Sequence, residues 1–236
     1  MNPADKFEIT TAILVDGGFY RKRSKYYSGP RSPKERADEL EHFCRALLQN
    51  KSERRRLYRI FYYDCPPISK KVYHPLLNKT IDFGRSADFQ WSTEFLNKLR
   101  KRRKFAVRLG LLSENTAQFR LKEDSLKKLI RKSISIDDLS EADFEFKVEQ
   151  KGVDMRIGVD IISMALKKQV QQIILISGDS DFVPAAKQAR REGLDVILAP
   201  MGAVIKSDLH EHIDGLISRT TPKVIHGETV KEPVKL

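Results

Sequence analysis

Five short runs along the chain are almost continuously apolar and rich in β-branched and aromatic residues. They are 12–16 (AILVD), 57–64 (LYRIFYYD), 104–112 (KFAVRLGLL), 172–177 (QIILIS) and 194–199 (LDVILA). Strands that are covered on both faces show this pattern, whereas a half-solvated strand alternates apolar and polar residues. The five runs therefore predict a mainly parallel, buried sheet.

Segments with helical periodicity separate these runs. They cover about residues 34–50, 68–80 with 88–103, 154–169 and 181–192. Strands that alternate with helices form right-handed βαβ units, in which the helices cover the faces of a parallel sheet. The predicted fold class is therefore α/β.

One polar, charge-mixed segment at about 113–140 interrupts this alternation. We expect it to be an insertion that contains a short helix at about 121–132. The run FEFKVEQ that follows, at 144–150, alternates apolar and polar residues as a strand does. We expect this strand to pair antiparallel with the end of the 104–112 run.

Asp154 has an unusual place in the predicted helix 154–169. Successive side chains in a helix step by about 100°. Asp154 therefore projects from the apolar face that carries Ile157 and Ile161, whereas Asp160 projects from the polar side into solvent. A carboxylate on an apolar face is either a helix N-cap, a role that Asp favours, or part of a site.

Other carboxylates follow the ends of predicted strands. Asp16 closes the first strand, and Asp179 and Asp181 follow the fourth. Open α/β sheets bind ligands in the crevice beyond the carboxyl ends of their strands. We expect these three residues to converge there with Asp154 if the first and fourth strands are neighbours. Asp64, at the end of the second strand before two prolines, is interpreted as a turn residue.

Such a cluster of carboxylates is costly at neutral pH unless it is protonated or neutralised. Oxygen ligands without His or Cys suit Mg²⁺ or Mn²⁺ rather than zinc. The pattern therefore favours a Mg²⁺ or Mn²⁺ site. For Asp181 alone, a first-turn carboxylate stabilised by the helix macrodipole stays an alternative.

The charge balance indicates a polyanionic partner. Among 236 residues, 44 Lys and Arg stand against 32 Asp and Glu, which leaves a net charge of +12. Such an excess favours nucleic acid, although a basic protein with a well-solvated surface stays possible. The segment 19–31 (FYRKRSKYYSGPR), expected to be a loop, interleaves tyrosines with cations, as single-strand binding sites do.

Cysteine content and hydropathy bear on the compartment. Cys44 and Cys65 have no Cys or His at metal-ligand spacing, so free thiols in a reducing cytoplasm are expected. No apolar run approaches the roughly 18 residues that span a bilayer. The N-terminus lacks the pattern of a secretory signal. We therefore expect a cytoplasmic protein without a membrane partner.

Several motifs together resemble the NYN domain family of the PIN-like nuclease superfamily, and its bacterial, LabA-like branch in particular. They are AILVDGGFY, FYYDCPP, the run from QKGVD through SGDSDF to VILAP, and DLHEHIDGLIS. The resemblance implies a three-layer α/β/α fold with sheet order 3-2-1-4-5. The domain would span residues 8–218, including the insertion, and residues 219–236 would form a C-terminal tail.

The resemblance also implies a metal-dependent endoribonuclease. Asp16, Asp154, Asp179 and Asp181 match the acidic residues of the family motifs and would be its catalytic residues and metal ligands. Hydrolysis would give 5′-phosphate and 3′-hydroxyl ends on single-stranded or structured RNA. The candidate substrate-binding residues are Lys151, Ser177, Ser180, Arg21, Arg23 and Lys25. Turn formation by the two serines and a solvated Lys151 stay alternatives.

One departure and two rival functions remain. Many family members carry Asn in the turn where this chain has Gly17 and Gly18, so an amide that could order water at the metal is missing. A catalytically silent RNA-binding or regulatory module is the alternative function. An aspartyl phosphatase is disfavoured because DGG lacks the second aspartate of Asp-x-Asp, and no nucleotide-binding glycine motif is present. A homodimer stays open.

Overall fold

The computed structural model describes residues 8–50, 53–221, 223–225 and 228–230. The chain divides into two compact units. The first comprises residues 1–64, 94–110 and 152–236, and the second comprises residues 65–93 and 111–151.

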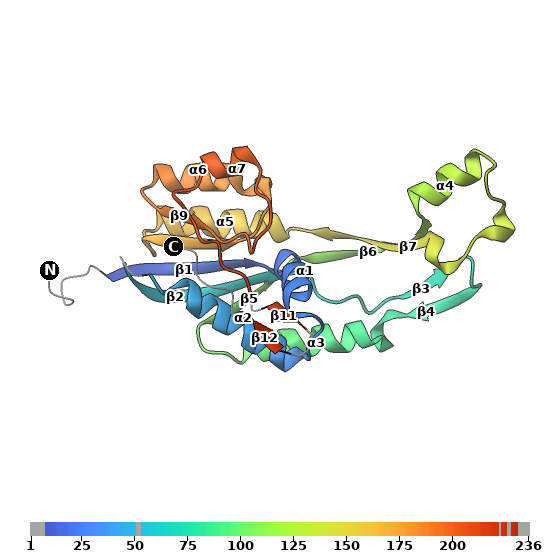
Figure 1. Cartoon of the computed structure of the whole chain (residues 1–236), viewed down its shortest axis with the longest axis horizontal. Coiled ribbons are helices and arrows are strands. Elements are labelled where there is room, and N and C mark those ends of the chain that lie inside the picture. The colour runs from blue at the N-terminus through green and yellow to red at the C-terminus, as the bar shows by residue number, and fades with distance from the viewer. Residues whose placement is uncertain (1–7, 51–52, 222, 226–227, 231–236) are drawn as a thin grey trace. The chain divides into compact units, whose positions relative to one another are not determined.

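A parallel sheet of six strands forms the centre of the first unit, in the order β10-β9-β8-β1-β2-β5 among the described residues (Figure 1). The strands are β1 (Glu8–Asp16), β2 (Arg54–Asp64), β5 (Phe105–Leu109), β8 (Gln172–Ile176), β9 (Asp195–Leu198) and β10 (Gly215–Leu216). The five predicted strands thus lie in the predicted order, and β10 extends the sheet beyond β9. The predicted α/β class is confirmed.

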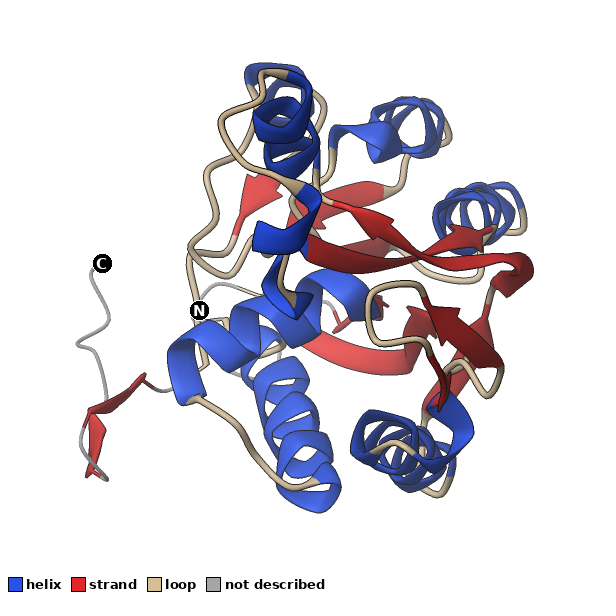
Figure 2. Ribbon diagram, turned by 90° about the vertical axis from the view of Figure 1, so that its right-hand side faces the viewer, coloured by secondary structure: helices blue, strands red, loops and turns tan. Residues whose placement is uncertain are grey.

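Helices cover both faces of this sheet (Figures 1 and 2). They are α1 (Gly17–Ser28), α2 (Pro33–Leu47), α3 (Ala87–Arg100), α5 (Val153–Leu166), α6 (Val183–Arg191) and α7 (Ser207–Glu211). Ala12 and Leu14 of β1 belong to the core under α5 and α6. Alternate strand residues point the other way, where the Tyr62 ring of β2 packs edge-on against Phe95 of α3, with centroids 5.6 Å apart.

Helix α1 was not expected from the sequence, which predicted a loop at 19–31. The helix forms because the Asp16 carboxylate caps it by accepting a hydrogen bond from Phe19 N (3.0 Å). It ends at Gly29, whose φ of 70° suits a residue without Cβ. Its buried face is small and polar apart from Tyr20, and includes Ser24, which hid the helical pattern from sequence analysis.

The second unit consists of two antiparallel strand pairs and short helices. They are β3 (Lys71–His74), β4 (Lys79–Asp82), η2 (Phe83–Arg85), β6 (Leu111–Leu121), α4 (Glu123–Ile130), η3 (Ile136–Asp138), η4 (Glu141–Asp143) and β7 (Phe144–Lys151). Leu111 pairs with Lys151, so the expected antiparallel pairing is confirmed, and α4 occupies the expected short helix. Rings of His74, Phe83, Phe119 and Phe146 pack against one another with centroids 4.2–6.1 Å apart.

The helix predicted at 68–80 is wrong, because β3 and β4 form a hairpin there. Val72 and His74 are buried and Tyr73 between them is 55% exposed, which is the period of a strand. Pro75 could not continue a helix, because it lacks the backbone N–H and its ring clashes with the preceding turn.

Part of the segment predicted to be a tail is folded. β11 (Lys223–Ile225) and β12 (Glu228–Val230) pair antiparallel. Residues 222, 226–227 and 231–236 of the predicted tail lie outside the described residues. None of the helices in the described ranges has the length and apolar character needed to cross a bilayer.

The first two residues of α1 should respond oppositely to substitution by alanine. A Cβ at Gly17 would lie 2.5 Å from Tyr63 O and 2.6 Å from the Tyr62 ring, whereas a Cβ at Gly18 would meet only Asp16 Oδ1, at 3.5 Å. We expect Gly17→Ala to lower the free energy of unfolding by about 1–3 kcal/mol through overpacking. Gly18→Ala should be neutral or stabilising, because alanine favours helix. Urea unfolding of both variants measures the difference, and equal losses would contradict the packing explanation.

Candidate active site

Asp16 is the last residue of β1, Ser177 follows the neighbouring strand β8, and the two side chains contact each other. Val15 of β1 pairs with Ile176 of β8, which brings the next residue of each strand to the same edge of the sheet. Ser177 is fully buried, and its Oγ donates a hydrogen bond to Asp16 Oδ2 (3.2 Å). The same Oγ accepts a hydrogen bond from Asp179 N (3.2 Å). Ser177 therefore links the two strand ends that carry Asp16 and Asp179.

Asp179 and Asp181 belong to the turn between β8 and α6. The Asp179 carboxylate caps the short helix η5 (Ser180–Phe182) by accepting a hydrogen bond from Asp181 N (3.1 Å). Both carboxylates are exposed. Gly178 lets this turn approach α1, since a Cβ there would lie 3.0 Å from the Phe19 ring. The strand end and the helix start thus present two carboxylates to solvent at the carboxyl edge of the sheet.

Asp154 lies in the first turn of α5 and does not cap it. The N-cap is Gly152, with φ 78° and no side-chain hydrogen bond, so the N-cap interpretation of Asp154 is wrong. Ile157 and Ile161 are fully buried, which confirms the predicted phase of this helix. Asp154 shares their side of the helix but lies one turn earlier and stays exposed. Among the described residues, its carboxylate makes no hydrogen bond or ion pair.

The carboxylates influence one another electrostatically. Burial raises the pKa of Asp16, the charges of Asp154 and Asp64 raise it further, and hydrogen bonds from Phe19 N and Ser177 oppose the shift. Partial burial also raises the pKa of Asp154, and the charges of Asp179 and Asp181 add to this effect. The four predicted acidic residues therefore lie close enough to repel one another electrostatically. This repulsion costs free energy, and a bound cation would relieve it.

The donor chemistry suits a hard cation, but the protein does not form a closed cage around one. Within the described ranges, no group of three or more His, Cys, Asp or Glu side chains is placed to hold a metal ion. Mg²⁺ commonly keeps several waters and binds through one or two carboxylates and a substrate phosphate. The Asp154 carboxylate, which has no partner among the residues that the structure describes, is available for such a contact. The residues present therefore fit a hydrated divalent cation.

Two further aspartates have roles that sequence analysis missed. Asp64 is only 5% exposed and accepts hydrogen bonds from Tyr62 (2.9 Å) and Arg21 (3.1 Å), so it is more than a turn residue. Asp160 was expected in solvent, and this was wrong. Its Oδ2 accepts a hydrogen bond from Tyr63 (2.7 Å) and pairs with Arg108 (2.8 Å). Tyr63 lies 97 residues from Asp160 and Arg21 lies 43 residues from Asp64, so these two contacts leave no local signal.

Three of the predicted substrate-binding residues lie on α1. Arg21 pairs with buried Asp64, at 3.1 Å. Arg23 donates hydrogen bonds to Met201 O (3.0 and 2.8 Å), so its guanidinium is engaged within the protein. Lys25 is exposed in the last turn of the helix. Arg21 and Arg23 thus have structural partners at this edge, and Lys25 projects into solvent.

The other predicted contacts differ from one another. Ser177 is buried between Asp16 and Asp179, so it orients carboxylates. The Ser180 hydroxyl accepts a hydrogen bond from Lys206 Nζ (3.3 Å), a cation that sequence analysis missed because it lies 26 residues away. Lys151 belongs to the second unit, where its Nζ pairs with Glu149 at 3.2 Å.

The positive charge of the chain is concentrated in the unit with the carboxylates. The second unit has 12 Lys and Arg and 11 Asp and Glu, a net charge of +1. The remaining 32 basic and 21 acidic residues give the first unit +11. A positive field around a negative cluster attracts a polyanion while leaving room for a cation at the centre.

The NYN domain family model matches residues 11–218. The chain belongs to the NYN domain family. No curated protein and no solved structure matches it. An NYN domain is a PIN-like, nuclease-type domain, and PIN-like nucleases as a class generally use divalent metal ions. This membership agrees with the sheet order and with acidic residues at the carboxyl edge.

The raised pKa of Asp154 predicts how stability depends on pH in this NYN domain without divalent ions. A folded-state pKa above the unfolded value makes stability fall as pH rises between the two values, and the penalty is complete above the folded pKa. Asp154→Asn should therefore raise the thermal midpoint at pH 7.5 in EDTA. At a pH below the unfolded pKa, about 3.9, the two proteins should melt together.

Asp124→Asn, which removes an exposed carboxylate of the second unit, changes the net charge equally and serves as the control. It should not raise the midpoint at pH 7.5, because the chain already carries excess positive charge. A midpoint of Asp154→Asn below wild type at pH 7.5 would show that its carboxylate stabilises the fold instead.

Proposed function

We propose that this NYN domain is a Mg²⁺- or Mn²⁺-dependent endoribonuclease of the LabA-like branch, with its domain at residues 8–218 and a tail at 219–236. The observation that carries the proposal is the Asp154 carboxylate. It has no hydrogen bond or ion pair within the described residues, and its pKa is raised by partial burial and further by the charges of Asp179 and Asp181. A protein keeps such a costly arrangement where the carboxylates bind a ligand.

The four aspartates would have two roles, direct ligation of the metal ion and orientation of water beside it. Asp16 and Asp179 would be direct ligands, because Ser177 links the Asp16 carboxylate to the backbone of Asp179. Asp154 and Asp181 would bind the ion or orient water beside it. When bound, the ion would activate water for attack and neutralise charge on the phosphoryl group. RNA cleavage would then leave 5′-phosphate and 3′-hydroxyl ends.

The basic residues and Ser180 would contribute to RNA binding either by direct contact with phosphates or through their positive charge. Lys206 and Ser180 form a hydrogen-bonded pair beside Asp179 and Asp181, and we propose that this pair contacts a backbone phosphate. Lys25, which is exposed, would add charge along the strand. Lys151 is exposed on the second unit and would be a phosphate contact of that unit. Arg21 and Arg23 would chiefly hold α1 in place while lending a positive field.

A catalytically silent RNA-binding module is the second candidate, favoured by the lack of a closed group of three metal ligands in the described part of the chain. It predicts binding of RNA without cleavage at any metal concentration.

We also propose a reducing, cytoplasmic location, supported by Cys44 and Cys65, which are both buried and form no disulfide.

Cleavage of labelled single-stranded RNA tests the proposal. Wild type should cleave with Mg²⁺ or Mn²⁺ and not in EDTA. Asp179→Asn should lower the rate at least about 100-fold, because loss of a group that stabilises developing charge has this effect. Asn keeps the side-chain oxygen that caps η5, so folding should persist. Analysis of the cleaved ends shows whether 5′-phosphates form.

Asp124→Asn is the matched control, since it removes one carboxylate from the second unit, and its cleavage rate should equal wild type. Cleavage by wild type and Asp179→Asn alike in EDTA would overturn the metal-dependent mechanism. Binding without cleavage by folded wild type would establish the silent module.

A further inference from the structure

Helix α1 presents one aromatic ring to solvent. The side chain of Tyr26 is 71% exposed, although Tyr20 on the same helix is fully buried. The helix begins directly after Asp16, so its position relative to the candidate active site is fixed by a continuous backbone. Tyr26 lies nine positions after Gly17 along the helix, which at about 1.5 Å per residue is a rise of about 14 Å.

Tyr26 shares a helix face with residues that line the carboxyl edge of the sheet. Phe19, Arg23, Tyr26 and Tyr27 follow the spacing that puts helical residues on one side. Phe19 contacts Gly178, in the turn after β8. Further along the same face, Arg23 and Tyr27 contact the segment after β9.

The contacts with the segment after β9 are close and specific. Two nitrogens of Arg23 donate to Met201 O, at 3.0 and 2.8 Å, and Nη2 also donates to Tyr27 Oη, at 2.9 Å. Gly202 has a φ of 70°, which favours glycine, and a Cβ there would lie 2.2 Å from Tyr27 Oη, so a larger residue would displace the tyrosine. This face of α1 therefore runs along the edge where the four aspartates lie.

The Tyr26 ring is supported from behind. The Arg23 guanidinium lies 5.3 Å from its centroid and 5.1 Å from the centroid of Tyr27. The two tyrosine rings contact edge to face, with centroids 5.1 Å apart. A ring held in this way loses little conformational entropy when a second flat group stacks on its open face.

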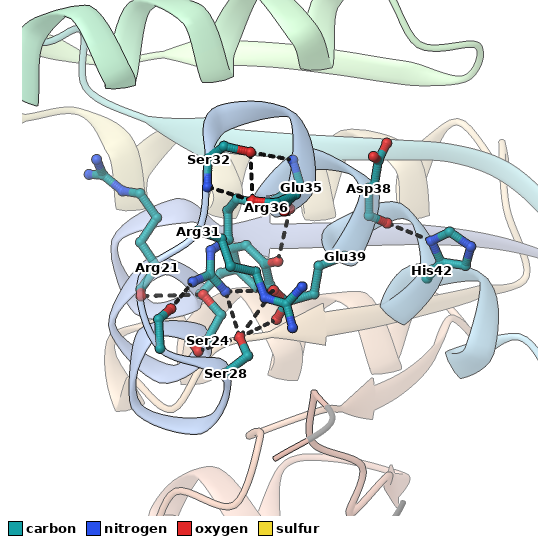
Figure 3. Close-up of polar contacts among 12 residues, drawn as sticks. Arg21, Ser24, Ser28, Arg31, Ser32, Glu35, Arg36, Asp38, Glu39 and His42 are labelled. Atoms are coloured by element: carbon teal, nitrogen blue, oxygen red, sulfur yellow. Dashed lines mark hydrogen bonds and ion pairs between the residues drawn. The ribbon is translucent and has the colours of Figure 1, made fainter. Parts of the chain in front are cut away.

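The far end of α1 is anchored to α2 (Figure 3). Arg36 Nη1 donates to Ser28 Oγ (2.9 Å) and pairs with Glu39 (2.7 Å), and Nη2 donates to Gly29 O. The Arg36 and Glu39 side chains are only 4% and 6% exposed, so this ion pair is shielded from water. Because the Asp16 carboxylate also caps its first turn, α1 is held at both ends and fixes the position of Tyr26 relative to Asp16.

We propose that Tyr26 is a stacking platform for an unpaired base of the RNA strand that occupies the candidate active site. This inference rests on the proposed function and adds the substrate class, a single strand. A length of about 14 Å corresponds to about four stacked nucleotides at 3.4 Å each, or fewer if the strand is extended. Bases in a duplex are already paired and stacked, so Tyr26 selects single-stranded RNA.

Binding in EDTA tests the platform without requiring cleavage. The probe is a fluorescently labelled single-stranded RNA of 12 nucleotides, with a duplex of the same sequence for comparison. Tyr26→Ala should weaken binding of the single strand roughly 5- to 150-fold, which is the range for loss of one stacked base. Tyr26→Phe and Tyr26→Trp should bind like wild type or more tightly. Duplex binding should change less than twofold.

A series of single abasic nucleotides along the probe separates stacking from an indirect structural effect. One abasic position should weaken wild type, and the penalty of Tyr26→Ala should disappear on that probe alone. Equal binding of wild type and Tyr26→Ala to the intact strand would overturn the platform, whether or not the protein cleaves RNA. So would an alanine penalty that persists on every abasic probe. Failure of cleavage with an intact Tyr26 effect would overturn only the nuclease proposal.

Discussion

The pairing of β1 with β8 is the constraint on which the rest of the structure depends. These strands are separated by more than 150 residues, yet their register puts Asp16 and Ser177 side by side. Ser177 then joins Asp16 to the backbone of Asp179 through one hydroxyl. Because both strands are buried on both faces in the middle of the sheet, a one-residue shift of register would move their side chains to the opposite face and disrupt the close packing of the core. The burial of the core therefore also sets the spacing of the carboxylates.

The carboxylates near this edge of the sheet differ in whether their charges are compensated by hydrogen bonds and ion pairs. Asp64 and Asp160 each pair with a tyrosine hydroxyl and an arginine, so their charges are compensated within the fold. Asp154 is left without such compensation in the described part of the chain. Removal of one partner from a buried charge pair leaves the other charge uncompensated at a high cost, whereas a carboxylate that already lacks a partner within a cluster is a candidate for ligand binding.

The basic residues of the first unit also differ in their roles. The first unit carries nearly all of the excess positive charge, yet several of its arginines are hydrogen-bonded within the protein. Arg36 joins α1 to α2, and Arg23 joins α1 to the segment after β9. The charge of Arg23 still contributes to the potential at the surface, because its hydrogen bonds to Met201 O and Tyr27 Oη are to neutral groups, whereas Glu39 compensates the charge of Arg36. Arg23 thus orients a helix and also adds to the positive potential of the first unit.

The sequence by itself determined the five strands, their order through the family motifs, and the four aspartates as candidates. Continuous apolar runs and Asp at strand ends are local signals, and burial on both faces produces them directly. The sequence did not reveal α1, whose buried side is mostly glycine and serine. It also did not reveal the hairpin at 71–82, where the spacing of apolar residues was compatible with both a helix and a strand. Tertiary structure alone decided which carboxylates are compensated, since Tyr63 meets Asp160 across 97 residues. Such partners are chosen by packing, which no local pattern encodes.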